Sequence, residues 1–337
     1  MKKPLKITII VLSSLLACIL AFLSIYYLWP WNKKFFNTAD EEFSIPGLDT
    51  AFVPQGMSLV DGSEDYLICG YMSDGSPSRI YLIDGETKEA TKYITLKVDN
   101  ADYIGHAGGI ASSGSSIWIV GDGYLYRFTL REFNNKQNGE SLYVDAYTDT
   151  LNGADFIFAN AGVLWVGEFY REGNYETRDA HHIKTRSGET NPAVVYGFTI
   201  DEQKKLGLYT TSTNSTPIPS MALSITGLVQ GITIATGENS RIIASSSYGL
   251  SDSKLYCYKN VLEEDAHSSI RYGLYTVPLW FLDNDALIST TTIPSMSEEI
   301  VTKNNRVYIL FESACKKYKI FNRVSLDSVY SLPISAL

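Results

Sequence analysis

The stretch VQGITIATG at residues 229–237 decides the fold, because versions of it recur along the chain. Each version has a polar or small first residue, an apolar strand and a turn containing glycine or asparagine. A second strand rich in Ile, Val and aromatic residues follows. The five copies are PQGMSLVDG (54–62), AGGIASSG (107–114), ADFIFANAG (154–162), VQGITIATG (229–237) and EEIVTKNN (298–305). Such a repeat is typical of a β-propeller, whose blades are four-stranded sheets around a channel.

The outer strands of each blade are less regular. We expect third strands at 78–84, 124–128, 193–198, 254–258 and 318–321. Fourth strands are weaker, and the best examples are 92–96 and 286–293. We therefore predict an all-β propeller at residues 42–337 with five four-stranded blades. Six blades are the alternative, because residues 262–285 could contain further strands.

The Ile-Pro pairs of the chain indicate how the ring closes. They stand at 45–46, 218–219 and 293–294, each shortly before a copy of the repeat. The pairs mark the end of an outer strand, but the first pair has no blade before it. We expect residues 42–46 to supply the outer strand of the last blade, which removes the open edge of the ring.

An apolar segment occupies the N-terminus. Residues 7–29 carry no charge and are long enough to cross a bilayer as a helix, with Trp29 and Trp31 as an interfacial belt. Lysines in residues 1–6 favour a cytoplasmic N-terminus. We predict a cytoplasmic stub at 1–6, a signal-anchor helix at 7–29, a linker at 30–41 and a single-pass cell-membrane protein with its propeller outside the cytoplasm.

A lipoprotein is the alternative to the anchor. The stretch LLAC at 15–18 resembles a bacterial lipobox, which would place an acylated N-terminus at Cys18. However, Leu16 stands where a smaller residue is usual, and the apolar run continues past the cysteine. The anchor is therefore the favoured interpretation.

The composition limits the partners. The chain of 337 residues has a formal net charge of −9 and 45% hydrophobic residues, which fits a folded globular protein and disfavours nucleic acid. Cys69, Cys257 and Cys315 form no disulfide or zinc pattern, and we expect small buried side chains there. The expected partners are the membrane and a small molecule, glycan or surface protein.

Polar residues are expected to meet at one mouth of the channel. In a propeller, the loop before each inner strand and the loop after each second strand lie on the same face. The first set contains Gln55, His106, Asp155, Gln230 and Glu298, and the second contains Tyr71, Asp122, Glu168, Tyr248 and Glu312. This convergence predicts a site, although polar groups also line propeller channels for structural reasons.

Two chemistries fit these residues. Glu298, Glu168, Glu312 and His106 are candidate general acids and bases, because crowding separates the pKa values of neighbouring carboxyl groups. Carboxylate oxygens also suit Ca²⁺, for which Glu298 and Glu312 are the candidate ligands. The candidate ligand-binding residues are Gln55, Asp155, Gln230, Tyr248 and Tyr71.

Glu299 follows Glu298 directly on the same strand. Adjacent residues on a strand point to opposite sides, so we expect Glu299 in a seam between blades.

The charged segment 171–192 follows Glu168 and should lie over the same face. A solvated insertion is the favoured interpretation, and a lid is the alternative. His181 and His182 are adjacent and therefore lack the spacing of a zinc site.

At the level of the fold, the repeat resembles extracellular β-propellers, over residues 42–337. It is similar to the SMP30/gluconolactonase and paraoxonase lactonases and to the five-bladed calcium-dependent nucleotidases. This resemblance implies Ca²⁺ under an inner-strand Glu, here Glu298 and more weakly Glu168 and Glu312. The Asn ligands of the lactonases are replaced at Gln55 and Gln230, and fold does not fix function.

Three functions follow from these patterns. The first is binding of a small molecule or glycan at the channel mouth, with Ca²⁺ as the candidate cofactor. The second is a hydrolase of lactonase, phosphohydrolase or glycosidase type. A water-accessible pair of carboxyl groups among Glu168, Glu298 and Glu312, beneath a pocket, would support this function. The third is a protein-interaction or adhesion module, which would present a broad Tyr- and Trp-rich surface instead.

Overall fold

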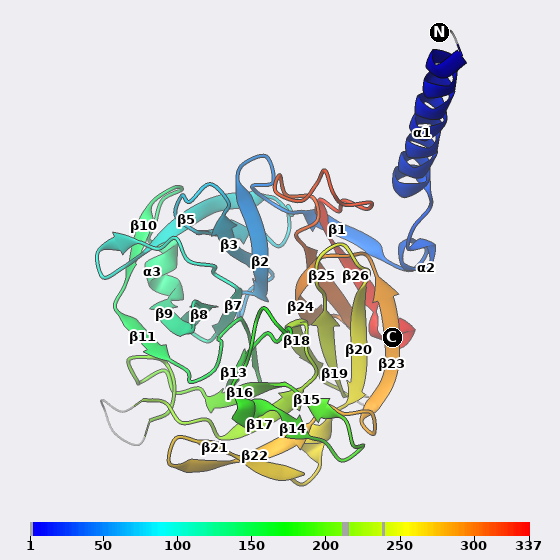
Figure 1. Cartoon of the computed structure of the whole chain (residues 1–337). Coiled ribbons are helices and arrows are strands. Elements are labelled where there is room, and N and C mark those ends of the chain that lie inside the picture. Colours follow the sequence, from blue (N-terminus) through cyan, green and yellow to red (C-terminus); the bar gives the residue numbers. More distant parts are fainter. Residues whose placement is uncertain (1–2, 211–215, 238–239) are drawn as a thin grey trace.

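The computed structural model describes residues 3–210, 216–237 and 240–337, and its main body is a five-bladed β-propeller (Figure 1). The five inner strands surround the channel, and each contacts the inner strands of the neighbouring blades. The predicted all-β class and the five four-stranded blades are confirmed.

The blades follow one another in chain order and each runs antiparallel from the channel outward. The first blade has β2 (Phe52–Leu59), β3 (Tyr66–Met72), β4 (Arg79–Ile83) and β5 (Ala90–Val98). The second has β7 (Gly109–Ser113), β8 (Ser116–Gly121), β9 (Tyr124–Thr129) and β11 (Ala146–Asp149). The third has β12 (Phe156–Asn160), β13 (Val163–Gly167), β16 (Ala193–Thr199) and β17 (Met221–Ile225). The fourth has β18 (Val229–Ala235), β19 (Arg241–Ser246), β20 (Ser253–Lys259) and β23 (Leu287–Ile293). The fifth has β24 (Ser297–Lys303), β25 (Arg306–Phe311), β26 (Ser328–Pro333) and β1 (Asp40–Ser44).

Additional strands extend two of the blades. In the first blade, β6 (Ala101–Asp102) and β10 (Ser141–Val144) both pair with β5. In the third, the hairpin β21 (Ser268–Tyr272) and β22 (Tyr275–Phe281) joins β17 in parallel. The segment 262–285 therefore contains the strands that we considered for a sixth blade, but it widens the third blade instead. The remaining elements are the hairpin β14 (Ile183–Lys184) and β15 (Thr190–Asn191), α3 (Leu130–Asn134) and 3-10 turns at Asp179–His181, Val261–Glu263 and Ile334–Ala336.

The N-terminal strand closes the ring as predicted, two residues earlier than expected. Strand β1 pairs antiparallel with β26, so both ends of the chain build the fifth blade. Phe43 is buried and packs against Tyr66 of the first blade, with ring centroids 4.7 Å apart. The expected third strand at 318–321 is wrong, since that stretch lies in turns and β26 takes its place.

Apolar side chains between blades form the core. Trp118 and Trp165 are both nearly inaccessible to solvent, and the buried clusters join strands of adjacent blades. The thiols of Cys69, Cys257 and Cys315 are buried and free, as the sequence predicted.

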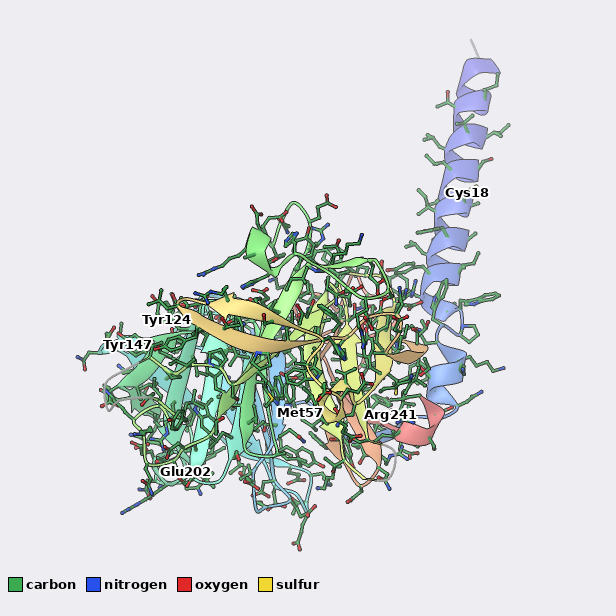
Figure 2. All side chains as sticks on the ribbon, turned by 90° about the horizontal axis from the view of Figure 1, so that it is seen from below. Cys18, Met57, Tyr124, Tyr147, Glu202 and Arg241 are labelled. Atoms are coloured by element: carbon green, nitrogen blue, oxygen red, sulfur yellow. The ribbon has the colours of Figure 1, made fainter. Side chains whose placement is uncertain are left out.

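The apolar segment forms one long helix that projects from the propeller (Figure 1). Helix α1 (Lys3–Leu28) is long and apolar enough to cross a membrane, which fits a single-pass anchor or a signal sequence. The expected linker at 30–41 contains the short helix α2 (Lys33–Phe36) and the start of β1. Figure 2 shows α1 extending past the end of the propeller that carries Tyr124, whereas Glu202 lies at the opposite end.

Candidate functional site

A cavity of about 490 Å³ opens at one mouth of the channel. It is lined by every polar residue that the sequence placed there except Glu168. These residues are Gln55, Tyr71, His106, Asp122, Asp155, Gln230, Tyr248, Glu298 and Glu312. The structure adds Phe169, Tyr175, Ser247 and Tyr318 to the walls.

Three inner strands present their polar residue to the cavity in the same way. The pairing register shifts at Gln55 in β2, at Gln230 in β18 and at Glu298 in β24. Such β-bulges add one residue to a strand and redirect its side chain. The repeat therefore positions an amide, an amide and a carboxyl group at equivalent points around the mouth.

Glu298 and Glu312 face each other at the floor of the cavity. The side chain of Glu298 is only 3% exposed, and that of Glu312 is half-buried. Burial raises the pKa of both carboxyl groups, and their mutual repulsion raises the pKa of Glu298 further. Neighbouring carboxyl groups that raise each other's cost of ionisation in this way do not readily carry a full negative charge each.

A chain of hydrogen bonds runs from this pair to the rim. The amide nitrogen of Gln55 donates to Oε2 of Glu312 at 3.0 Å. The amide oxygen of Gln55 lies 2.5 Å from Nε2 of His106, so that ring nitrogen is the donor. Desolvation lowers the pKa of His106, although its side chain lines the cavity and is partly exposed there. The neutral ring thus keeps Nδ1 as an acceptor.

Aromatic rings form the wall beside His106, and one lysine is hydrogen-bonded to them. Tyr71 stacks on the His106 ring with centroids 4.7 Å apart. Lys317 donates from Nζ to the Tyr71 hydroxyl at 2.6 Å, and the hydroxyl of Tyr318 lies 3.4 Å from that of Tyr71. The segment that follows Glu312 therefore contributes directly to the site.

Asp155 faces the cavity from the third blade. Its Oδ2 accepts a hydrogen bond from the backbone N–H of Phe169 at 2.7 Å. Burial nevertheless raises the pKa of Asp155 to about 6, with a smaller contribution from Glu168. Perturbed carboxyl groups gathered in one cavity are typical of functional sites.

Glu299 lies across the channel, and its expected place in a seam between blades is wrong. The bulge in β24 breaks the alternation on which that expectation rested. The side chain is buried beside Gly231 of the fourth blade and the backbone N–H groups of Ile232 and Ile157. Because Ile157 belongs to the third blade, which does not adjoin the fifth, the carboxyl group spans the channel axis. Among the described residues its oxygens have no partner with good hydrogen-bond geometry, and burial raises its pKa well above the usual value.

Glu168 points away from the cavity and is not brought together with Glu298. It is 2% exposed, and its Oε1 lies 2.7 Å from Nδ1 of His181 and accepts from the backbone N–H of Val194 at 2.9 Å. Nε2 of His181 in turn lies 3.1 Å from the Tyr196 hydroxyl. These contacts fix the loop after Glu168 onto the third blade. The loop is therefore neither a purely solvated insertion nor a free lid, and it supplies Phe169 and Tyr175 to the cavity.

The cavity has only part of what a calcium ion requires. Ca²⁺ takes six to eight oxygen ligands. Within residues 3–210, 216–237 and 240–337, no three His, Cys, Asp or Glu residues stand close enough to hold a metal ion. Glu298 and Glu312 with the amide oxygens nearby would give an incomplete ligand set.

Comparisons with known proteins find distant likeness in fold only. No family model matches the chain, and no curated protein matches it. Among solved structures, the chain resembles glutaminyl cyclase of Myxococcus xanthus, with 11% identity over 81% of this chain and 91% of that chain and a TM-score of 0.42. It also resembles exo-beta-1,3-galactanase of Phanerochaete chrysosporium, with 8% identity over 88% and 62% and a TM-score of 0.45. It also resembles hydrazine synthase of Kuenenia stuttgartiensis, with 9% identity over 77% of this chain and 56% of that chain and a TM-score of 0.38. This chain thus spans just over half of the hydrazine synthase chain, and none of these likenesses assigns it an activity.

Proposed function

We propose that this protein is a membrane-anchored hydrolase that cleaves a small ester or lactone in the channel-mouth cavity. The observation that carries the proposal is the pair of buried carboxyl groups of Glu298 and Glu312, which line an open cavity and raise the pKa of Glu298 by their repulsion. A water-accessible pair beneath a pocket is the sign that separates a hydrolase from a simple binding protein. The propeller lies outside the cytoplasm in this proposal, because of the lysines before α1.

The two carboxyl groups would divide the acid and base roles. Glu298, the group with the more strongly raised pKa, holds the proton, and Glu312 is the base. Glu312 takes a proton from a water molecule, and the water oxygen attacks the carbonyl carbon. Glu298 gives its proton to the leaving oxygen, so that water and ester yield an acid and an alcohol. Gln55 orients Glu312, and His106 orients Gln55.

The geometry favours acyl transfer over the other hydrolytic reactions. Glycosidases place their two carboxyl groups about 5 Å or more apart on either side of the bond. Two carboxyl groups whose repulsion pushes their pKa values apart can instead activate one water molecule between them, as in aspartic proteases. Phosphoryl transfer needs several cations around the phosphate, whereas the cavity is lined by Asp122, Asp155 and the glutamate pair.

The test is hydrolysis of dihydrocoumarin and p-nitrophenyl acetate by the full chain in detergent micelles. We expect Glu298→Gln and Glu312→Gln each to lower kcat by about 10²-fold or more, which is the usual contribution of a general acid or base. Glu202→Gln, at the opposite end of the propeller, is the matched control and should keep the wild-type rate. The wild-type rate should depend on pH with a bell shape set by the pair. Wild-type rates in both variants, or no hydrolysis of either probe, would overturn the proposal.

Calcium binding by Glu298 and Glu312 is the alternative use of the same residues. It predicts that Ca²⁺ raises the melting temperature of the full chain and that Glu298→Gln abolishes the rise. Under the hydrolase proposal, the melting temperature does not respond to Ca²⁺, because Glu298 keeps its proton and the pair offers only a single negative charge.

A further inference from the structure

The loop between β25 and β26 combines basic and apolar residues at the surface of an otherwise acidic protein. Its sequence at 316–323 is KKYKIFNR, whereas the whole chain has a net charge of −9. Ile320 is 73% exposed and Phe321 is 62% exposed. Lys316, Lys317 and Lys319 are also exposed. An apolar tip surrounded by lysines is typical of a segment that rests on an anionic membrane surface.

The interior of the protein holds this loop rigidly. Asn322 is almost fully buried, and its Oδ1 accepts from the hydroxyl of Ser295 at 2.9 Å. Cys315 is buried, and its carbonyl oxygen accepts from the backbone N–H of Lys319 at 2.9 Å. Exposure of Ile320 and Phe321 is therefore a fixed feature of the fold.

The membrane helix ends at the same loop. The hydroxyl groups of Tyr26 and Tyr27 donate to the carbonyl oxygens of Phe321 and Ile320, each at 2.7 Å. Arg323 lies over the Trp31 ring at 4.5 Å. The end of an apolar helix in the bilayer is at the level of the lipid headgroups, so these contacts place Ile320 and Phe321 at that level too.

The loop also belongs to the cavity wall through Tyr318, and Lys317 donates to the hydroxyl of the wall residue Tyr71. Helix α1 extends past the end of the propeller that carries Tyr124, two residues after the cavity residue Asp122 (Figure 2). The mouth of the cavity and the membrane helix are therefore on the same side of the propeller.

We propose that this face docks on the bilayer through Ile320, Phe321 and the neighbouring lysines, so that the cavity receives its substrate from the membrane surface. The proposal deepens the proposed function and rests on it for the reaction. The substrate class is an amphiphilic ester whose polar head enters the cavity while its apolar part stays in the bilayer. The lysines contact anionic lipid phosphates at the rim, and the acidic floor takes hydroxyl or amine groups of the head.

Fluorescence quenching by nitroxide lipids tests the docking on the full chain in nanodiscs of phosphatidylcholine and phosphatidylglycerol. A nitrobenzoxadiazole label is placed at Phe321→Cys in a Cys18→Ser background. The matched control is Gln203→Cys, the exposed neighbour in sequence of Glu202, which lies at the opposite end. A nitroxide near the top of the acyl chain should lower the emission at position 321 roughly twofold or more and leave position 203 unchanged. A label at Tyr175→Cys, on the cavity rim, should respond to a headgroup nitroxide instead. Equal emission at 321 and 203 with either lipid would overturn the docking.

A charge reversal and the ester assay separate the two proposals. Lys316→Glu with Lys319→Glu should remove most of the quenching at 321 in anionic nanodiscs, and an unchanged signal would contradict the role of the lysines. Docking without hydrolysis of dihydrocoumarin or p-nitrophenyl acetate would overturn the hydrolase alone. Hydrolysis of these esters without docking would overturn the membrane-facing substrate alone.

Discussion

The inner strands of the fourth and fifth blades share one backbone shape and carry different chemistry. Both begin with a β-bulge, formed by Gln230 and Gly231 in β18 and by Glu298 and Glu299 in β24. A Cβ atom on Gly231 would lie 2.5 Å from Oε1 of Glu299 and 2.8 Å from its Cα. The glycine of one blade therefore makes the space that the carboxyl group of the other blade fills.

Glycine recurs at this level of the channel. Gly56 and Gly109 occupy the same point in the first and second blades, and a Cβ on either would meet a neighbouring inner strand within 2.8 Å. The channel is thus too narrow here for a long side chain from every blade. A symmetric repeat can place a carboxyl group on the axis only if one blade departs from the others, and the fifth blade does so.

The two blades also differ in how the chain builds them. The four strands of the fourth blade all come from residues 229–293, apart from the β21–β22 hairpin that extends the third blade, whereas the fifth blade takes its outer strand from the N-terminus. The blade with the buried carboxyl groups therefore also closes the ring.

The largest expected effect comes from breaking this closure. Phe43→Ala removes a buried ring that joins β1 to the first blade, and we expect it to lower the free energy of unfolding by about 3–5 kcal/mol. Thr292→Ala, on the exposed face of the outer strand of the fourth blade, should change it by less than about 0.5 kcal/mol. Urea unfolding of the full chain in micelles measures both. Similar losses in the two variants would contradict the special role of β1.

Crowding the channel should have the next largest effect. Gly231→Ala forces its new Cβ against Glu299, and we expect a loss of about 1–3 kcal/mol in the free energy of unfolding. In a Glu299→Gly background, the contact with Oε1 disappears and the contact with Cα remains, so part of this loss should be recovered. A double-mutant cycle measures the coupling between the two sites. Additive effects would show that Glu299 does not occupy the space beside Gly231.

The sequence predicted those features that the repeat itself determines. Gln55, Gln230 and Glu298 could be placed at the channel mouth because each precedes an apolar strand in equivalent copies. The Ile-Pro pair at 45–46 predicted the closing strand because an outer strand without a blade must complete the ring. The cavity, with its walls of Tyr71 and Tyr248, follows from the same alignment of strand ends.

The remaining features depend on contacts that the repeat does not encode. The partner of Glu168 is His181, which a loop brings back onto the third blade, and only the burial of a carboxylate at a strand end hinted at such a partner. The bulge in β24 overrides the alternation that would have turned Glu299 away from the channel. The sequence at Ile320 and Phe321 has the apolar character of a strand, but the structure places both residues in an exposed turn beside helix α1.

Glu299 should make stability depend on pH. Its pKa is raised in the folded state, so the unfolded chain loses the proton first as the pH rises. The contribution of Glu299 to stability therefore falls from about pH 4, the ordinary Glu pKa, up to its raised folded value. Glu299→Gln removes this fall in stability with rising pH. Each pKa unit by which folding raises the pKa of Glu299 corresponds to about 1.4 kcal/mol in the free energy of unfolding.

The measurement is urea unfolding of the wild-type chain and Glu299→Gln at pH 5 and pH 8. We expect the variant to be the more stable at pH 8, by more than about 1.4 kcal/mol, and the difference to shrink at pH 5. Glu202→Gln, far from the channel axis, should follow the wild-type chain at both values. A constant difference between Glu299→Gln and the wild-type chain would mean that the carboxyl group does not change its proton affinity on folding.

The smallest expected effect comes from giving the fourth blade the carboxyl group of the fifth. Gln230 is half-buried on the cavity wall, so Gln230→Glu adds a partly solvated carboxylate and should change the free energy of unfolding by less than about 1 kcal/mol. Its negative charge nevertheless raises the pKa values of Glu298 and Glu312 further. The pH–rate profile for dihydrocoumarin should therefore move to higher pH, whereas Gln230→Met, of similar size and without charge, should leave it in place. An unshifted profile for Gln230→Glu would mean that the groups titrating in the rate profile lie outside this cavity, and the catalytic role of the fifth blade would fail with it.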